Sequence, residues 1–261
     1  MPDRPVVTHS VIIDGSLEGL LTTVYSYYYE KLRPSGMQDG SLPSFQQRLG
    51  EEYIYVKTDP ERAAKVYEAM EHKFSHDTMS RIHGAAAHID KNRFYDLFRY
   101  ILLAFKEPER VDMYEGFDYV LNVHQLAKGV YMEAHLLKGF TRFRKSGEGI
   151  LYAEIEPKHD GLWFICEHFC DRLGGERWII HDAGRGKAGV FDCSECVIVP
   201  VPQGLKAGFA EDEREREFQK LWTAFYKTIG IQERANSKLR RQNSPKYFWK
   251  HMTEHRPDLG N

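Results

Sequence analysis

The sequence predicts an α+β protein: a helical N-terminal half with a short strand pair, followed by a ββαββ antiparallel sheet unit and C-terminal helices. Three observations predict this class. Apolar residues recur at helical spacing through most of residues 60–138. After Gly139 the pattern changes to a two-residue alternation, which is typical of strands with one buried face. A last amphipathic helical pattern follows in residues 211–230.

Residues 1–90 predict an α/β region. A short apolar run at 11–13 indicates a strand, and Asp14-Gly15-Ser16 supplies turn and capping residues for the helix that follows. Residues 33–51 are rich in proline, glycine and serine, so we expect a loop. A second strand covers 53–58, and Asp59-Pro60 begins another helix, because proline is favoured at the first helical position.

Residues 91–261 predict an α+β domain that packs with the first region as one unit. Its first part holds two amphipathic helices, of which the second ends near Gly139. A hairpin follows around the turn at 145–149, then a helix that carries two cysteines. Strands at 177–182, 188–192 and 196–202 complete a mostly antiparallel sheet with a helix on one face.

The composition is ordinary for a soluble globular protein, with 42% hydrophobic and 28% charged residues in a chain of 261. No apolar run approaches the roughly 20 residues of a membrane span. The N-terminus lacks the basic and apolar regions of a signal peptide. We therefore expect a cytoplasmic protein without a membrane partner.

Basic residues are concentrated near the C-terminus. Residues 227–250 contain seven lysines and arginines against one glutamate, a net charge of +6 in a chain whose total is −2. Such asymmetry indicates a polyanion-facing end, although a solvated helix face gives the same pattern. We expect Trp249 to pack inward, three residues before Met252. The residues predicted to contact phosphate are Lys238, Arg240, Arg241 and Lys246, with Tyr247 as the adjacent aromatic.

A second candidate for anion binding follows the long helix. Arg142 and Arg144 alternate with Phe143, so both arginines lie on one face of the predicted strand, and His135 lies near their base. These side chains could cradle a phosphate. Alternatively, His135 complements the helix dipole and the arginines form a solvated face.

The candidate catalytic residues lie at the end of the predicted strand 177–182. His181 and Asp182 follow its apolar run, and Arg185 comes three residues later. A histidine with an adjacent carboxylate can move protons near neutral pH. Together with His135 these residues form a possible His/Asp/Arg site, provided that the segments 135–144 and 181–185 meet. The alternative is a turn-closing aspartate beside a surface histidine.

The four cysteines lie in a C-x3-C and a C-x2-C arrangement, which superficially resembles a zinc site. Cys166 and Cys170, however, belong to one apolar helical stripe, and buried cysteine behaves as a small hydrophobe. We therefore predict no metal site. The glycine pattern at 184–189 matches G-x-G-x-x-G, but a strand rather than a helix follows, so we expect no cofactor.

Six stretches in order carry a family resemblance: "IIDGSLEGLL", "YMEAHLLKGFTRFR", "LYAEIEPKHD", "EHFCDRL", "WIIHDAGRGKAGVFD" and "ERANSKLRRQNSPKYFWKHMTEH". They resemble the bacterial "probable DNA metabolism protein" family, whose main domain is the uncharacterised DUF4130 domain. The resemblance covers residues 10–255. It implies a setting in DNA repair or modification beside a radical-SAM protein, and it implies no particular reaction. The matched positions include Asp14, Gly15, Gly19, His135, Gly139, Phe140, Arg142, Phe143, His168, Phe169, His181, Asp182, Arg185, Arg234, Asn236, Pro245, Tyr247 and Trp249.

Three functions follow as hypotheses. The first, which we favour, is a DNA-binding accessory protein that works with a radical-SAM partner. The second is an enzyme that processes nucleic acid or nucleotides with the His/Asp/Arg site. The third is a pure protein-interaction module whose aromatic residues at 25–29 and 94–105 form an apolar surface for the partner.

Overall fold

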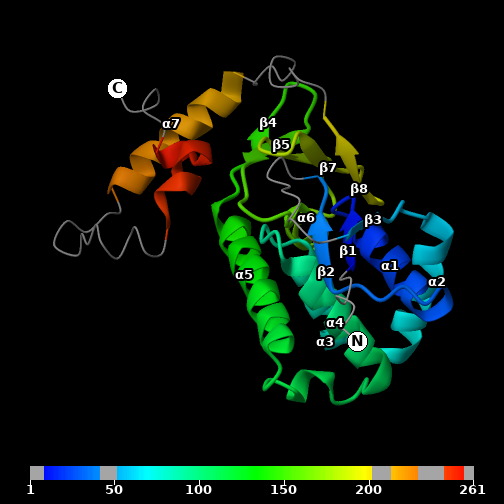
Figure 1. The fold of residues 1–261 in the computed structure, drawn as a ribbon. Helices are drawn as coiled ribbons and strands as arrows, with labels where there is room; N and C mark the ends of the chain where they lie inside the picture. The colour runs from blue at the N-terminus through cyan, green and yellow to red at the C-terminus, as the bar shows by residue number, and fades with distance from the viewer. Residues whose placement is uncertain (1–8, 42–51, 202–212, 229–243, 256–261) are drawn as a thin grey trace, which may run out of the picture. The chain divides into compact units, whose positions relative to one another are not determined.

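The computed structural model describes residues 9–41, 52–201, 213–228 and 244–255. The chain divides into two compact units, residues 1–130 and 131–261 (Figure 1). The domain boundary at residue 90 stays a prediction. Among the described residues, no helix combines the length and the apolar character that crossing a membrane requires.

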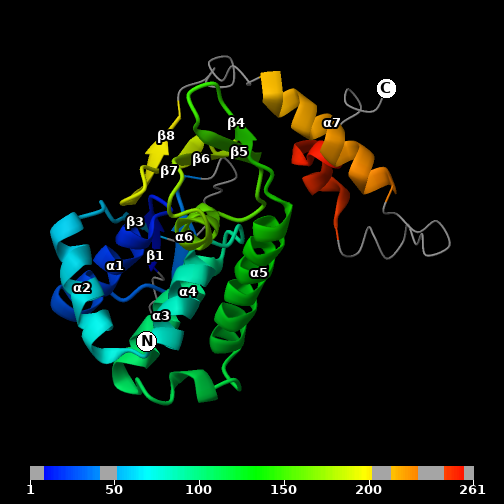
Figure 2. The same cartoon turned by 180° about the vertical axis from the view of Figure 1, so that it is seen from behind.

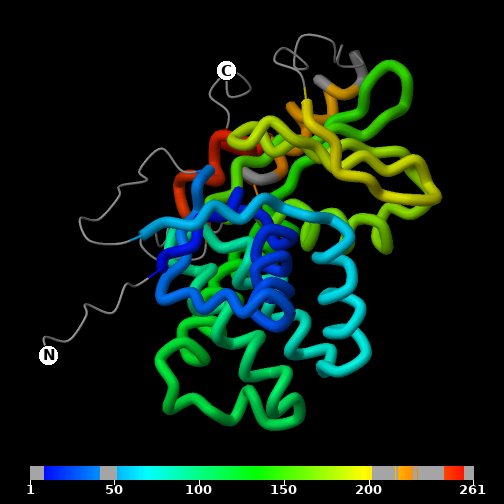
Figure 3. The backbone as a smooth tube through the Cα atoms, turned by 45° about the vertical axis from the view of Figure 1, so that its right-hand side comes forward, coloured from blue at the N-terminus to red at the C-terminus, as the bar shows by residue number. Residues whose placement is uncertain are grey.

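The first unit contains a three-stranded parallel sheet of order β2-β1-β3. Its strands are β1 (His9–Ile13), β2 (Gly36–Asp39) and β3 (Glu52–Tyr55). Helix α1 (Leu17–Tyr29) is capped by Ser16, whose side chain accepts a hydrogen bond from the Gly19 amide. The sequence predicts a capping residue at this position. Helix α2 (Pro60–Lys73) begins at Asp59 with proline at its first position, and it packs beside α1 (Figure 3).

The remaining helices of the first unit are α3 (His76–Ala86), α4 (Arg93–Lys106), the 3-10 turn η1 (Val111–Met113) and the first half of α5 (Asp118–Phe140). Asp112 joins these helices, because its carboxylate accepts hydrogen bonds from the side chains of Tyr100 (2.5 Å), His124 (2.9 Å) and Arg81 (2.9 Å). The prediction that the aromatic residues at 94–105 form an exposed apolar surface is wrong in part. Phe94 and Phe98 are buried, because the apolar stripe of α4 faces the core.

The second unit is built on a five-stranded sheet of order β4-β5-β6-β7-β8 (Figure 2). The strands are β4 (Arg144–Lys145), β5 (Leu151–Ile155), β6 (Trp178–Asp182), β7 (Lys187–Phe191) and β8 (Cys196–Pro200). Helix α6 (Leu162–Arg172) connects β5 to β6 and packs on β7 and β8. The C-terminal elements are α7 (Glu213–Thr228) and the 3-10 turns η4 (Lys246–His251) and η5 (Thr253–His255).

The two faces of this sheet differ in chemistry. One face carries Ala153, Ile155, Trp178, Ile180 and Phe191, which form a buried core with the apolar side of α6. The register pairs Tyr152 with Ile179 and Glu154 with His181, which places these side chains on the opposite face. The sheet therefore has a polar face with titratable groups.

The predicted α+β class is confirmed, and the sheet of the second unit is mostly antiparallel as expected. One pair differs: β5 and β6 are parallel, because a helix crosses between them and returns the chain in the same direction. The predicted strand pair of the first unit is a trio, since residues 36–39 of the expected loop form β2 beside β1. This strand is short and buries only Met37 and Asp39, so its apolar signal is weak.

Candidate functional site

Two loops meet at the carboxyl ends of β5 and β6. The Ala183 amide donates to the Ile155 carbonyl (3.0 Å), which continues the strand pairing beyond β6. The Arg185 guanidinium then donates to the carbonyls of Pro157 (2.9 Å) and Lys158 (2.7 Å). The predicted residue Arg185 therefore holds the 157–158 loop next to the 183–186 turn.

Asp182 closes that turn. It is fully buried, and one carboxylate oxygen accepts the amides of Gly184 (3.0 Å) and Arg185 (3.1 Å). The other oxygen accepts the Arg185 guanidinium (3.2 Å). This is the turn-closing geometry that the sequence offers as an alternative to catalysis. The catalytic role of Asp182 and Arg185 stays a prediction, and these contacts do not require one.

A buried carboxylate on α5 ties this loop to the C-terminal segment. Glu133 accepts the amides of Lys158 (2.9 Å) and His159 (2.8 Å) and the hydroxyl of Tyr247 (3.1 Å). Burial raises the pKa of Tyr247, and the Glu133 charge raises it further, so the phenol stays protonated and donates. Glu133 thus holds η4 against α5.

His181 lies on the polar face of the sheet and is 7% exposed. Its Nδ1 lies 2.9 Å from the Tyr152 hydroxyl, and the ring tautomer decides which atom donates. Burial raises the pKa of Tyr152 to about 12, with a contribution from Glu154, while Arg144 opposes the shift. Arg144 lies with its guanidinium 5.5 Å from the Tyr152 ring. The predicted residues His181 and Arg144 therefore flank one phenol.

His251, which the sequence did not single out, completes this polar face. Its Nδ1 lies 3.5 Å from a Glu154 oxygen, and its Nε2 lies 3.6 Å from a Glu156 oxygen. Lys250 pairs with the same Glu156. An imidazole with a carboxylate near each ring nitrogen can accept or deliver a proton. The only sequence signal for this cluster is the alternation of Glu154 and Glu156 at the end of β5.

His135 and Arg142 lie elsewhere in this unit. His135 is exposed on α5, whereas His181 is buried, so the two histidines have different surroundings. The Arg142 guanidinium makes a bidentate pair with Glu254 (2.8 and 3.2 Å) and also donates to the Gly139 carbonyl (2.8 Å). Arg142 therefore fixes η5, and its predicted role in phosphate binding stays a prediction.

The C-terminal 3-10 turn η4 has a buried side and an exposed side. Phe248 (4% exposed) and Met252 (5%) belong to the core of the second unit, and Trp249 donates to the Ser244 carbonyl (2.9 Å). Lys246 is exposed, and Tyr247 is 48% exposed although its hydroxyl is bound. The predicted residues Lys238, Arg240 and Arg241 lie outside the described residues.

Three of the four cysteines gather between α6 and β8. Cys166 is buried, and the Cys196 thiol is hydrogen-bonded with Cys166 and Cys170. Burial raises the pKa of Cys196 to about 11, with a contribution from Cys170, so these thiols are protonated at neutral pH. Within the part of the chain that the structure describes, no group of three His, Cys, Asp or Glu side chains is placed to hold a metal ion.

Comparison with known proteins adds one finding. A family model described as DUF4130, domain of unknown function, matches residues 91–254, well over half of the chain. The match spans the polar face of the sheet, the 157–158 loop and η4. No curated protein matches the chain.

Proposed function

The chain belongs to the DUF4130 family, and on that premise we propose that it is a DNA-binding accessory protein of a repair or modification system. In this proposal it acts in the cytoplasm beside a radical-SAM partner, which supplies the redox chemistry. The family resemblance supplies that setting. The surface chemistry of η4 supports nucleic acid as the ligand.

The observation that carries the proposal is the fixed position of η4. Phe248 and Met252 anchor it in the core, and Tyr247 is bonded to buried Glu133. Lys246 is thereby presented to solvent from a rigid base, next to the basic stretch that precedes it in the sequence. A cation on a rigid support can neutralise a backbone phosphate without losing much conformational freedom on binding.

The test is the affinity for labelled single- and double-stranded DNA, measured by fluorescence anisotropy at low salt. Replacing Lys246 by Gln should weaken binding about fivefold, as expected for one lost phosphate contact of about 1 kcal/mol. Lys91→Gln, which removes an exposed lysine from the first unit, is the matched control and should leave the affinity unchanged. Absence of binding to both forms of DNA would exclude the proposal.

The polar face favours a second candidate function, an enzyme that processes nucleic acid or nucleotides. His251 between Glu154 and Glu156 provides acid–base chemistry, and His181 with Tyr152 lies on the same face. In this case His251→Gln should abolish turnover of a DNA substrate while leaving the DNA affinity unchanged. Equal turnover by the variant and the wild type would remove His251 from the reaction.

The partnership with a radical-SAM protein is tested separately. Both proteins should co-elute as one complex when they are expressed together. Two species that elute independently would argue against a stable partnership. This result would not bear on DNA binding, which the affinity measurement tests.

A further inference from the structure

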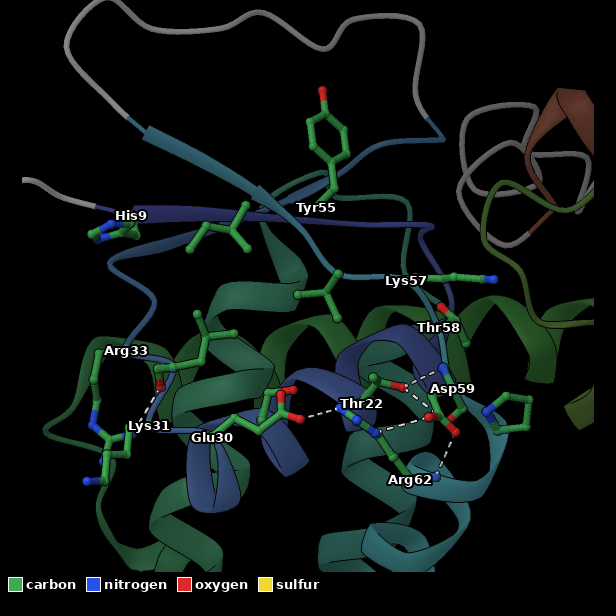
Figure 4. Close-up of a pocket in the computed structure, with 15 residues that line it drawn as sticks. His9, Thr22, Glu30, Lys31, Arg33, Tyr55, Lys57, Thr58, Asp59 and Arg62 are labelled. Atoms are coloured by element: carbon green, nitrogen blue, oxygen red, sulfur yellow. Dashed lines mark hydrogen bonds and ion pairs between the residues drawn. The ribbon is translucent and has the colours of Figure 1, made fainter.

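A groove with a volume of about 970 Å³ lies in the first unit, between β3 on one side and α1 with the start of α2 on the other (Figure 4). His9, Lys31 and Arg33 gather toward one end of the groove, and Lys57, Thr58 and Asp59 lie toward the other. The volume is in the range of small-molecule binding sites.

The groove has an excess of positive charge. Arg62 pairs with both acidic residues of the lining, Glu30 (2.7 Å) and Asp59 (3.0 Å). The charged side chains of Lys31, Arg33 and Lys57 make no ion pair with any carboxylate of the described residues. Four lysines and arginines against two acids give the lining a net charge of +2 with His9 neutral. This charge suits an anionic ligand.

Lys31 occupies a backbone conformation that favours glycine. Its φ is 59°, in the left-handed region, immediately after α1. The amides of Glu30 (2.9 Å) and Leu32 (3.2 Å) both donate to the Ser26 carbonyl, which closes the helix end. Glycine adopts this conformation without strain, whereas a lysine does so at a cost. A strained residue whose charge lines a groove is an observation that points to function.

Arg33 is held in place beside Lys31. Its guanidinium donates to the carbonyls of Tyr27 (2.6 Å) and Leu32 (3.0 Å) and lies 4.0 Å from the centre of the Tyr27 ring. All these partners are uncharged. Among the described residues, no carboxylate pairs with the Arg33 guanidinium. A guanidinium fixed in this way is preorganised for a phosphate.

The rest of the lining offers a surface for an uncharged ring. Ile54 and Val56 of the β3 segment and Leu32 after α1 are half-buried and line the groove. Figure 4 shows the Tyr55 side chain pointing away from the helices, which leaves the neighbouring aliphatic residues to form this wall. Aliphatic side chains beside a cationic end match a ligand with an apolar ring and a phosphate.

We propose that this groove binds one nucleotide unit, with its phosphate at Lys31 and Arg33 and its base against Ile54 and Val56. The unit is either a free nucleoside monophosphate or one nucleotide of a single strand, since both present the same chemistry. The proposal does not rest on the proposed function, because the groove lies in the first unit and η4 lies in the second.

Lys31→Gly tests the proposal, because it removes the charge and the strain together. The variant should melt at the same temperature as the wild type or higher, so loss of binding cannot come from unfolding. Its affinity should fall about tenfold, as expected for one lost charge-assisted contact. Lys91→Gly, also a lysine-to-glycine change in an exposed turn, should bind like the wild type.

Two probes separate the sources of the nucleotide. Binding of AMP, measured by calorimetry and weakened by Lys31→Gly, identifies a free nucleotide as the ligand. Binding of a short oligo(dT) strand alone, weakened in the same way, identifies a strand. If neither probe binds, or if Lys31→Gly and Lys91→Gly bind both probes equally, the proposal is overturned. Lys246→Gln should leave AMP binding unchanged, which keeps this test distinct from that of η4.

Discussion

At the residue scale, Arg142 shows how a distant contact changes the meaning of a side chain. The alternation of Arg142 and Arg144 around Phe143 predicts that both arginines lie on one face of a strand, but β4 begins only at Arg144 and Arg142 lies before it. The partner of Arg142 is Glu254, 112 residues later, and Trp222 donates to the same carboxylate (3.2 Å). No local pattern predicts such a pairing, because it depends on how the C-terminal segment folds back.

Replacing Glu254 by Gln should destabilise the protein by about 1–3 kcal/mol, because the half-buried Arg142 loses the buried carboxylate charge with which it pairs. The loss appears as a lower midpoint in urea denaturation. Glu148→Gln, in the exposed turn before β5, is the control and should have little effect. Equal midpoints for the two variants would contradict a stabilising role for the pair.

The same carboxylate predicts a dependence on pH. Burial acts to raise the pKa of Glu254, but the hydrogen bonds from Arg142 and Trp222 outweigh it and lower the pKa below its ordinary 4.5. Its contribution is therefore fully present above pH 4.5 and is lost as the pH falls through the lowered value. The difference in unfolding free energy between the wild type and Glu254→Gln should shrink over this window.

His159 also predicts that stability falls at lower pH, but here the cause is a buried histidine that stays neutral in the folded protein. Burial lowers its pKa below 6.5, although Glu133 acts to raise it. Below pH 6.5 the unfolded chain binds a proton at this histidine that the folded protein excludes, so stability falls as the pH falls to the lowered pKa. His159→Gln should remove this part of the pH dependence in urea denaturation. An unchanged pH profile would show that His159 titrates normally in the folded protein.

At the scale of elements, local patterns predicted most helices and strands. The capping residues Ser16 and Asp59 begin α1 and α2, and the alternation after Gly139 becomes β4 and β5. What local patterns could not predict is pairing. Strand β2 has few apolar residues, and the parallel direction of β5 and β6 follows from the path of α6. The apolar stripe of α7 was predicted, yet Phe218 and Leu221 are exposed in the structure.

The packing of α6 on β7 can be tested at Gly189. A methyl group there would clash with the Cys166 sulfur, so Gly189→Ala should destabilise the protein by about 1–3 kcal/mol. Gly147→Ala is the matched control, since its added methyl meets no described atom within 4 Å. Cys166→Ala in the same chain as Gly189→Ala should recover part of the loss, because it removes the sulfur. A loss that is purely additive in urea denaturation would show that the two positions do not touch.

At the scale of the whole molecule, the candidate site gathers residues that the sequence spreads over more than 100 positions. His181, Asp182 and Arg185 were found because a strand end and a turn mark them locally. Glu133, Glu154 and His251 were missed, because their proximity depends on α5, β5 and η4 coming together. The net charge of a stretch depends only on its residues and not on how the chain folds. The basic C-terminal stretch could therefore be identified from the sequence alone.

The measurement that tests the central claim most directly is the salt dependence of DNA affinity. If the protein binds DNA through phosphates at its basic C-terminal surface, the logarithm of the association constant should fall linearly with the logarithm of the salt concentration. Lys246→Gln should reduce that slope by about one on duplex DNA, while Lys91→Gln should leave it unchanged. An affinity that does not depend on salt, or equal slopes for all three proteins, would contradict phosphate binding at η4.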